Sequence, residues 1–268
     1  EIDEVDSLYV MTFSTGAPLL INHIADLKSP EKKLKGAVMI SAAIKAKNRL
    51  AFLAPAAQYF VPWSTVFPEE DAVRYETFST HAAAEFYKLT KNLLDKKYRF
   101  KLPLFIAISA DDDTVSAEAA LKYFCSAETD TKRMVWYQHA DTNKKEKLAY
   151  FDEGQGACKQ NIFVREAEEI GLPDYYKSFA HTALSVPPSD PHYGVNGAYK
   201  QCKHYFEDKD FKEFEECKRA VLPSFVVGET TDSFKERYGG IKSIRRGVYN
   251  PDYETMETEI FSFIGSID

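Results

Sequence analysis

Ser14 is the first candidate for chemistry because it lies in a short turn between an apolar run at 8–11 and a helical pattern from Pro18. Gly16, two residues later, allows the backbone to bend tightly. A strand-to-helix turn of this kind exposes the serine and directs the following N–H groups outward, where the helix N-terminus stabilises negative charge. The pattern predicts that Ser14 is a nucleophile and that the Thr15 N–H is one donor of an oxyanion hole.

A serine hydroxyl is a weak nucleophile, so this chemistry also needs an imidazole base and a carboxylate that orients it. Three aspartates, at 111–113, directly follow an apolar run of strand length at 102–109. Two histidines compete for the role of base. His139 directly follows a predicted strand, whereas His181 lies about forty residues later in a turn-rich stretch. The residues alone leave these alternatives open.

Together these motifs resemble the α/β-hydrolase superfamily, more narrowly its lipase, lysophospholipase and carboxylesterase-like members. The motifs stand in the order serine, acid, histidine that this superfamily uses. Position by position, the resemblance implies Ser14 as the nucleophile, Asp112 as the acid and His181 as the base, with Asp111 and His139 as the rivals. The segments that carry the resemblance are 9–16, 109–115 and 178–184, with further likeness at 187–194 and 249–253.

The activity that the resemblance implies is hydrolysis of carboxylic esters through an acyl-enzyme, on a small-molecule or lipid ester substrate and without a metal or another cofactor. Two departures from the family pattern matter. Thr12 stands where a glycine is usual, and the serine comes at position 14, before which the superfamily normally has about four strands and an oxyanion loop. We therefore expect the N-terminal part of the fold to be a separate segment or chain. These departures also support an alternative, a hydrolase-like domain that binds a ligand or partner without catalysis.

The elements that must position these residues form an alternation of strands and helices. Apolar runs of strand length separated by helical patterns predict an α/β fold with a mostly parallel sheet. Ser116 is a predicted N-cap, and the helix that follows it separates two of the strands. The predicted strands are 8–11, 36–41, 102–109, 133–137 and 162–164; the predicted helices after the first are 116–124, 207–221 and 252–264.

The stretch from 43 to 98 differs from its surroundings because it is helical in pattern, rich in aromatic residues and broken by prolines. We predict that it is a helical cap inserted into a core formed by 1–42 and 99–268. Its aromatic side chains suit an acyl group, and they suit equally well the core of a helical unit.

Composition excludes several classes of protein. The 268 residues are 44% hydrophobic and carry a formal net charge of −7. This negative charge disfavours electrostatic binding to the phosphate backbone of nucleic acid. The sequence contains no run of about 20 apolar residues, so no membrane-spanning helix is predicted. The first residues have neither the basic start nor the apolar run of a secretory signal, so the chain either has none or has lost it. The compartment, cytoplasmic or secreted, stays open.

Four cysteines, at 125, 158, 202 and 217, have no zinc-like spacing, and free thiols are the favoured interpretation. Cys202 and Cys217 flank a charged helical stretch and could form a disulfide in an oxidising compartment, but their spacing does not decide this.

Overall fold

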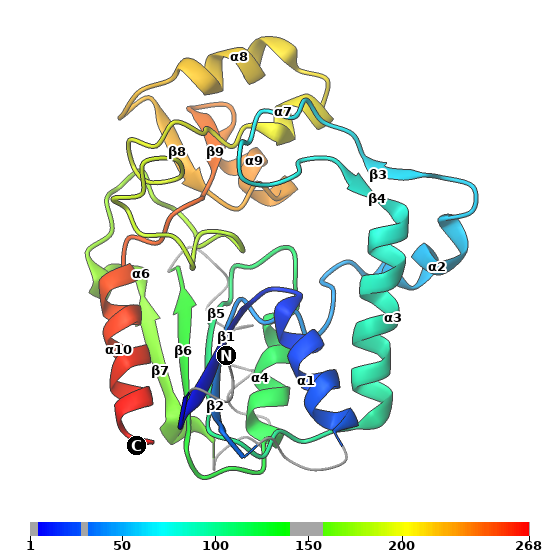
Figure 1. The fold of residues 1–268 in the computed structure, drawn as a ribbon. Helices are drawn as coiled ribbons and strands as arrows, with labels where there is room; N and C mark the ends of the chain where they lie inside the picture. Colours follow the sequence, from blue (N-terminus) through cyan, green and yellow to red (C-terminus); the bar gives the residue numbers. More distant parts are fainter. Residues whose placement is uncertain (1–4, 28–31, 140–157, 268) are drawn as a thin grey trace.

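A five-stranded parallel sheet forms the centre of the computed structural model, which describes residues 5–27, 32–139 and 158–267 (Figure 1). The strand order is β1-β2-β5-β6-β7, and each neighbouring pair is parallel. The predicted α/β class and its strands are confirmed. The strands are β1 (Leu8–Phe13), β2 (Leu34–Ile40), β5 (Leu104–Ser109), β6 (Lys132–Gln138) and β7 (Ile162–Glu166).

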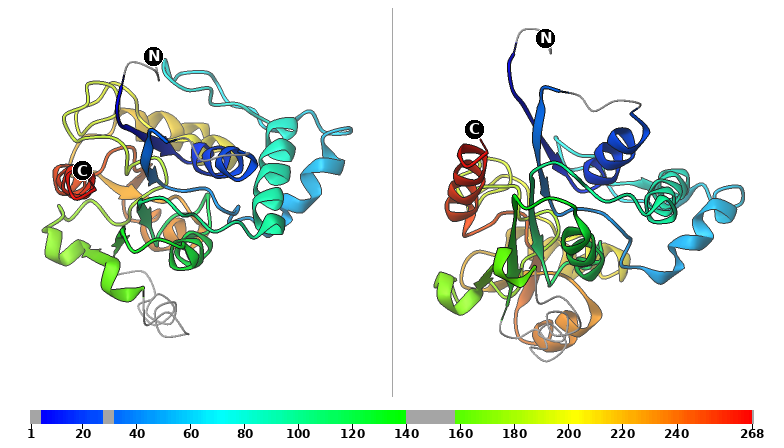
Figure 2. Two further views of the ribbon diagram at one scale, coloured as in Figure 1. Left: turned by 60° about the horizontal axis from the view of Figure 1, so that its bottom comes forward. Right: turned by 90° about the horizontal axis from the view of Figure 1, so that it is seen from below.

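Helices cover both faces of this sheet, which explains why its central strands are apolar at nearly every position. Helices α1 (Gly16–Asp26) and α4 (Ala117–Ser126) pack on the face that carries Met39, Ile106 and Trp136. Helix α10 (Tyr253–Gly265) packs on the other face, as Figure 2 shows. Consecutive residues of each strand therefore enter two different cores, and β5 is buried along its whole length.

The 43–98 segment lies beside the sheet and is only partly helical. Its longest element, α3 (Thr80–Lys96), packs against α1 and against a short helix, α2 (Ala54–Ala57). The 3₁₀ helix η2 (Arg49–Leu53) precedes α2. A small antiparallel pair that the sequence did not predict, β3 (Trp63–Thr65) and β4 (Phe78–Ser79), joins α2 to α3.

A second small sheet lies beyond the carboxyl ends of the central strands (Figure 1). It pairs β8 (Phe225–Gly228) with β9 (Ser243–Arg246) in parallel, and the sequence analysis did not predict it. Three helices surround it: α7 (Lys203–Glu207), α8 (Phe211–Arg219) and α9 (Asp232–Tyr238). The remaining short elements are η3 (Lys159–Asn161) and α6 (Ala167–Ile170), which flank β7.

The prediction of a single helix at 207–221 is wrong, because the helical conformation is interrupted between α7 and α8. Lys209 has a φ of 58°, in the left-handed region that does not continue a helix. The carboxylate of Asp210 then accepts a hydrogen bond from the Glu213 N–H at 3.1 Å and caps the new helix.

Two disulfides correct the expectation of free thiols. Cys202 is bonded to Cys217, and Cys125 is bonded to Cys158, a pair that the sequence analysis did not consider. The Cα–Cα distances, 6.1 Å and 5.4 Å, lie in the usual range for such bonds. Across the described ranges, no helix combines the length and the apolar character needed to cross a membrane.

Candidate active site

Ser14 occupies a strained turn between β1 and α1. Its φ is 51°, a left-handed conformation that is unusual for a residue with a side chain, and its N–H donates to the Ile40 carbonyl at 3.0 Å. A Cβ at Gly16 would lie 3.2 Å from the Cβ of Thr12. The threonine is therefore accommodated in this turn because position 16 has no side chain. The geometry is that of a nucleophile elbow.

The structure brings Ser14, His181 and Asp112 together, although they are far apart in the sequence. Nε2 of His181 lies 2.9 Å from Oγ of Ser14, and Nδ1 lies 2.6 Å from Oδ2 of Asp112. A carboxylate only accepts hydrogen bonds, so Nδ1–H is the donor, and in the neutral imidazole Nε2 is then free to accept from the serine. The Ser14 hydroxyl is therefore within hydrogen-bond reach of an imidazole, as a general base requires.

The loop after β5 orients the Asp112 carboxylate. Its other oxygen, Oδ1, accepts from the N–H groups of Thr114 at 2.8 Å and Val115 at 2.9 Å. Asp111 has a different role, because its Oδ2 accepts from the Phe179 N–H at 3.2 Å. Of the two rival aspartates, Asp112 is thus the one hydrogen-bonded to His181, while Asp111 fastens the histidine loop.

Polar side chains at the ends of neighbouring strands hold the loop that carries His181. Ser41, which follows β2, donates to the His181 carbonyl at 2.8 Å, and Ser109, at the end of β5, donates to the Phe179 carbonyl at 2.8 Å. Carboxyl ends of parallel strands share one edge of a sheet, so these groups converge there. His139, the alternative base, follows β6 and is not the imidazole that contacts Ser14.

Glu229 is a residue at this site that the sequence analysis missed. It directly follows β8, its side chain is buried, and it forms an ion pair with Arg246 at 2.9 Å. Its Oε1 also accepts from the His181 N–H at 2.9 Å. The apolar run Phe225–Gly228 that ends in an acidic residue resembles the pattern at 104–111 and is the signal that could have revealed it.

A cavity of about 1100 Å³ opens beside Ser14 and His181. Most residues that line it come from the 43–98 segment and are apolar, among them Leu53, Trp63 and Phe86. Arg74 also lies in the wall. A cavity of this size and character suits a ligand with a substantial hydrocarbon part.

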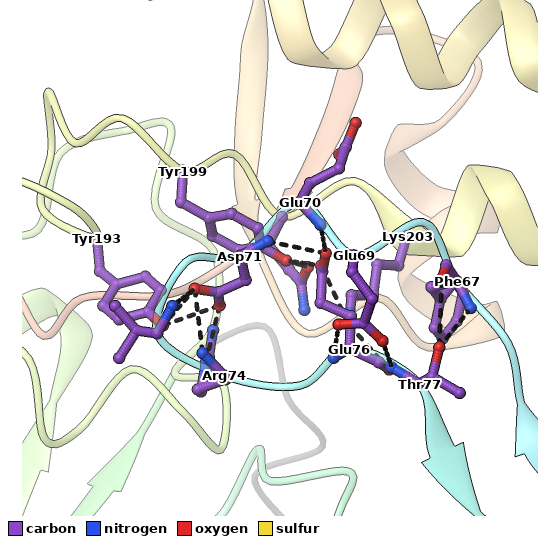
Figure 3. A network of polar contacts seen from close by, with 12 residues as sticks. Phe67, Glu69, Glu70, Asp71, Arg74, Glu76, Thr77, Tyr193, Tyr199 and Lys203 are labelled. Atoms are coloured by element: carbon purple, nitrogen blue, oxygen red, sulfur yellow. Dashed lines mark hydrogen bonds and ion pairs between the residues drawn. The ribbon is translucent and has the colours of Figure 1, made fainter.

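The β3–β4 connection at 66–77 is fastened to residues 192–203 by a polar network (Figure 3). Glu76 accepts from the Tyr199 hydroxyl and forms an ion pair with Lys203 at 3.2 Å. Asp71 accepts from the Tyr193 hydroxyl at 2.8 Å and contacts Nε2 of His192 at 2.9 Å. Burial raises the pKa of the Asp71 carboxyl, but hydrogen bonds, including these two, outweigh it and hold the pKa below its usual range.

The topology and the order of the site residues decide the class of fold. The parallel sheet, the strained serine turn after a strand, Asp112 after a later strand and His181 in a subsequent loop form a recognised arrangement. The chain has an α/β-hydrolase-like fold. This confirms the fold class that the sequence motifs predicted.

No family model and no curated protein matches the chain. The solved structures that are similar to it in part include three lipolytic enzymes, and the chain spans 61–65% of the length of these three. One is a monoacylglycerol lipase of Paleococcus ferrophilus, at 16% identity over 51% of this chain and 61% of that one, TM-score 0.41. Another is a soluble variant of monoglyceride lipase from Saccharomyces cerevisiae, at 14% identity over 61% and 65%, TM-score 0.40. The third comes from the metagenome-derived lipolytic enzymes LipS and LipT, at 15% identity over 55% and 63%, TM-score 0.41.

Proposed function

We propose that the protein is a serine hydrolase that cleaves carboxylic esters, of the lipase, lysophospholipase or esterase type. The observation that carries this proposal is the continuous hydrogen-bonded chain from Ser14 through His181 to Asp112, at the wall of an apolar cavity. A strained serine, an imidazole on its hydroxyl and a carboxylate behind the imidazole are the parts that nucleophilic acyl transfer requires.

In the first half of the reaction, Nε2 of His181 takes the proton of the Ser14 hydroxyl while Oγ attacks the ester carbonyl carbon. The carbonyl oxygen becomes an oxyanion, and we assign the Thr15 N–H, at the start of α1, the role of a donor to it. The protonated imidazole then gives its proton to the leaving alcohol as the carbon–oxygen bond breaks, which leaves an acyl-Ser14 ester. In the second half, His181 removes a proton from water, the hydroxide attacks the acyl carbon, and the acid leaves as Oγ regains its proton.

Asp112 holds the imidazole in the tautomer that this sequence requires and stabilises the imidazolium that forms. Its carboxylate is held by the Thr114 and Val115 N–H groups, so the orientation of the imidazole follows from the loop after β5.

We assign the 43–98 segment the role of a cap that binds the acyl chain. The apolar cavity beside Ser14 is lined mostly by this segment, so its side chains set the size of the substrate while the triad sets the reaction. Esters with medium or long acyl chains are therefore expected to be hydrolysed with a higher kcat/KM than acetyl esters of the same alcohol.

The test is hydrolysis of p-nitrophenyl esters by the wild type and by Ser14→Ala. Removal of the nucleophile should lower kcat by roughly 10⁶-fold, to background in practice. Ser233→Ala, at an exposed position on helix α9, is the control and should behave like the wild type. A fluorophosphonate should label the wild type at Ser14 only. Turnover that survives in Ser14→Ala would exclude this mechanism. A wild type that neither hydrolyses esters nor is labelled would favour a non-catalytic binding domain.

We also propose that the protein functions in an oxidising compartment. The two disulfides support this, because such bonds rarely persist in reducing cytosol. Thiol titration of the denatured, unreduced protein from its natural source should detect no free cysteine. Four titratable thiols would refute the assignment.

A further inference from the structure

Glu229 contacts the loops that carry both the acid and the base of the site. A single carboxylate oxygen, Oε1, accepts from the N–H of His181 at 2.9 Å and from the N–H of Asp113 at 3.2 Å. The side chain is only 4% exposed. The His181 loop and the loop after β5 are far apart in the sequence. One atom, Oε1, thus accepts hydrogen bonds from both of them.

The surroundings of Glu229 fix where that atom lies. Its own N–H donates to Oγ of Ser178 at 2.6 Å, and a Cβ at the preceding Gly228 would lie 2.4 Å from the same Oγ, so this close approach requires glycine. Nε of Arg246 donates to Oε2 at 2.9 Å and its Nη2 donates to Oε1 at 3.4 Å, so Arg246 holds the carboxylate with Oε1 directed at the two N–H groups. Nη2 of Arg246 also donates to the Thr114 hydroxyl at 2.9 Å, on the loop that carries the acid.

We infer that Glu229 is a positioning residue for the reaction: its Oε1 holds the backbone of His181 and of Asp113 in register, so that the imidazole meets both Asp112 and Ser14. The inference rests on the proposed function. Its physical basis is that a displacement of about 1 Å between reacting groups can lower a rate by roughly 10²-fold. Without Oε1, two backbone donors in a largely buried site lose their acceptor, and the two loops lose one of the contacts that set their relative position.

Two substitutions of Glu229 distinguish the effect of side-chain length from the effect of charge. Glu229→Gln keeps the length of the side chain and an amide oxygen that can accept from both N–H groups, but it removes the charge that faces Arg246 and turns an NH₂ group toward the Nε–H of Arg246. Glu229→Asp keeps the charge but is one methylene shorter. Positioning through Oε1 predicts that Glu229→Gln keeps kcat within about threefold, whereas Glu229→Asp loses about tenfold or more in kcat with KM within about twofold.

Asp252→Asn is the matched control for loss of stability. Asp252 is also a buried carboxylate paired with one arginine, Arg165 at 2.6 Å, but it stands at the start of α10, where its side chain accepts hydrogen bonds from Arg165 and Tyr137. Its substitution should lower Tm while kcat of the folded enzyme changes by less than about twofold, because the loops of the site keep their contacts. A fall in kcat that merely followed Tm would then be recognised, since the control would show it too.

The inference is overturned if Glu229→Asp retains wild-type kcat, if Glu229→Gln loses as much kcat as Glu229→Asp, or if the change falls on KM. A second readout does not need turnover. The low-field proton NMR signal of the imidazole N–H that bonds Asp112 should persist in the wild type and Glu229→Gln and should broaden or disappear in Glu229→Asp. A wild type that shows this signal but hydrolyses no ester would refute the proposed function and not the positioning role.

Discussion

Substitution of Asp112 by asparagine tests the proposed site most directly, because the structure dictates which way the new amide must point. In the wild type, Oδ1 accepts from the Thr114 and Val115 N–H groups, and Oδ2 accepts from Nδ1 of His181. In Asp112→Asn the amide oxygen must remain at the Oδ1 position, since an NH₂ group there would face two donors. The NH₂ group is therefore directed at Nδ1 of His181.

The expected loss of activity follows from the tautomer that this amide imposes. An NH₂ donor requires Nδ1 to be an acceptor, which places the imidazole proton on Nε2, the atom that faces Ser14 at 2.9 Å. That nitrogen can then no longer take the serine proton. In the serine proteases the same substitution lowers kcat by about 10⁴-fold, and we expect a loss of about 10³–10⁴-fold here, which corresponds to about 4–5.5 kcal/mol in activation free energy.

The assay is kcat for p-nitrophenyl ester hydrolysis at saturating substrate, with the folded state checked by circular dichroism. Asp111→Asn is the paired control, since its Oδ2 accepts from the Phe179 N–H and not from the imidazole. Its kcat should fall by less than about tenfold. The reasoning is refuted if folded Asp112→Asn keeps kcat within about tenfold of the wild type, or if Asp111→Asn is the more damaging of the two.

Three further predictions concern stability. Burial, with a smaller contribution from a nearby lysine, lowers the pKa of His204 to about 4, and neither ring nitrogen has a hydrogen-bond partner among the residues that the structure describes. In the unfolded chain the pKa of this histidine is about 6.5, so below that pH the unfolded state binds more protons than the folded state. The free energy of unfolding should therefore fall by about 2 kcal/mol between pH 8 and pH 5. In His204→Leu, urea titrations at these pH values should lack this contribution to the pH dependence. Opening the Cys202–Cys217 bond, which closes a separation of 15 residues, should cost about 3 kcal/mol, and a Cys202→Ala/Cys217→Ala variant whose urea midpoint equals the wild type's would contradict this. Glu76→Gln, which removes the charge that pairs with Lys203, should cost about 2 kcal/mol and expose 66–77 to limited proteolysis; an unchanged cleavage pattern would count against the network as the fastening of this segment.

The sequence was sufficient to predict structural features that depend only on residues near one another in the chain. The buried strands were predictable because a parallel strand covered on both faces is a continuous apolar run, as at 104–109. The turn at Ser14 was predictable because a strand, a small residue and a helix follow one another within a few positions. Short strands such as Phe225–Gly228 were not predicted, because four residues are too few to show the alternation of apolar and polar side chains.

The sequence by itself determined the class of fold, the strand ends at which polar residues gather, and the candidates for nucleophile, acid and base. Only the tertiary structure decided which histidine meets Ser14, which aspartate meets that histidine, and that Glu229 joins the two loops that carry them. The physical reason is that a loop's position depends on where its backbone groups find partners. The groups that hold His181 stand at the ends of β2, β5 and β8, and no spacing along the chain encodes that convergence.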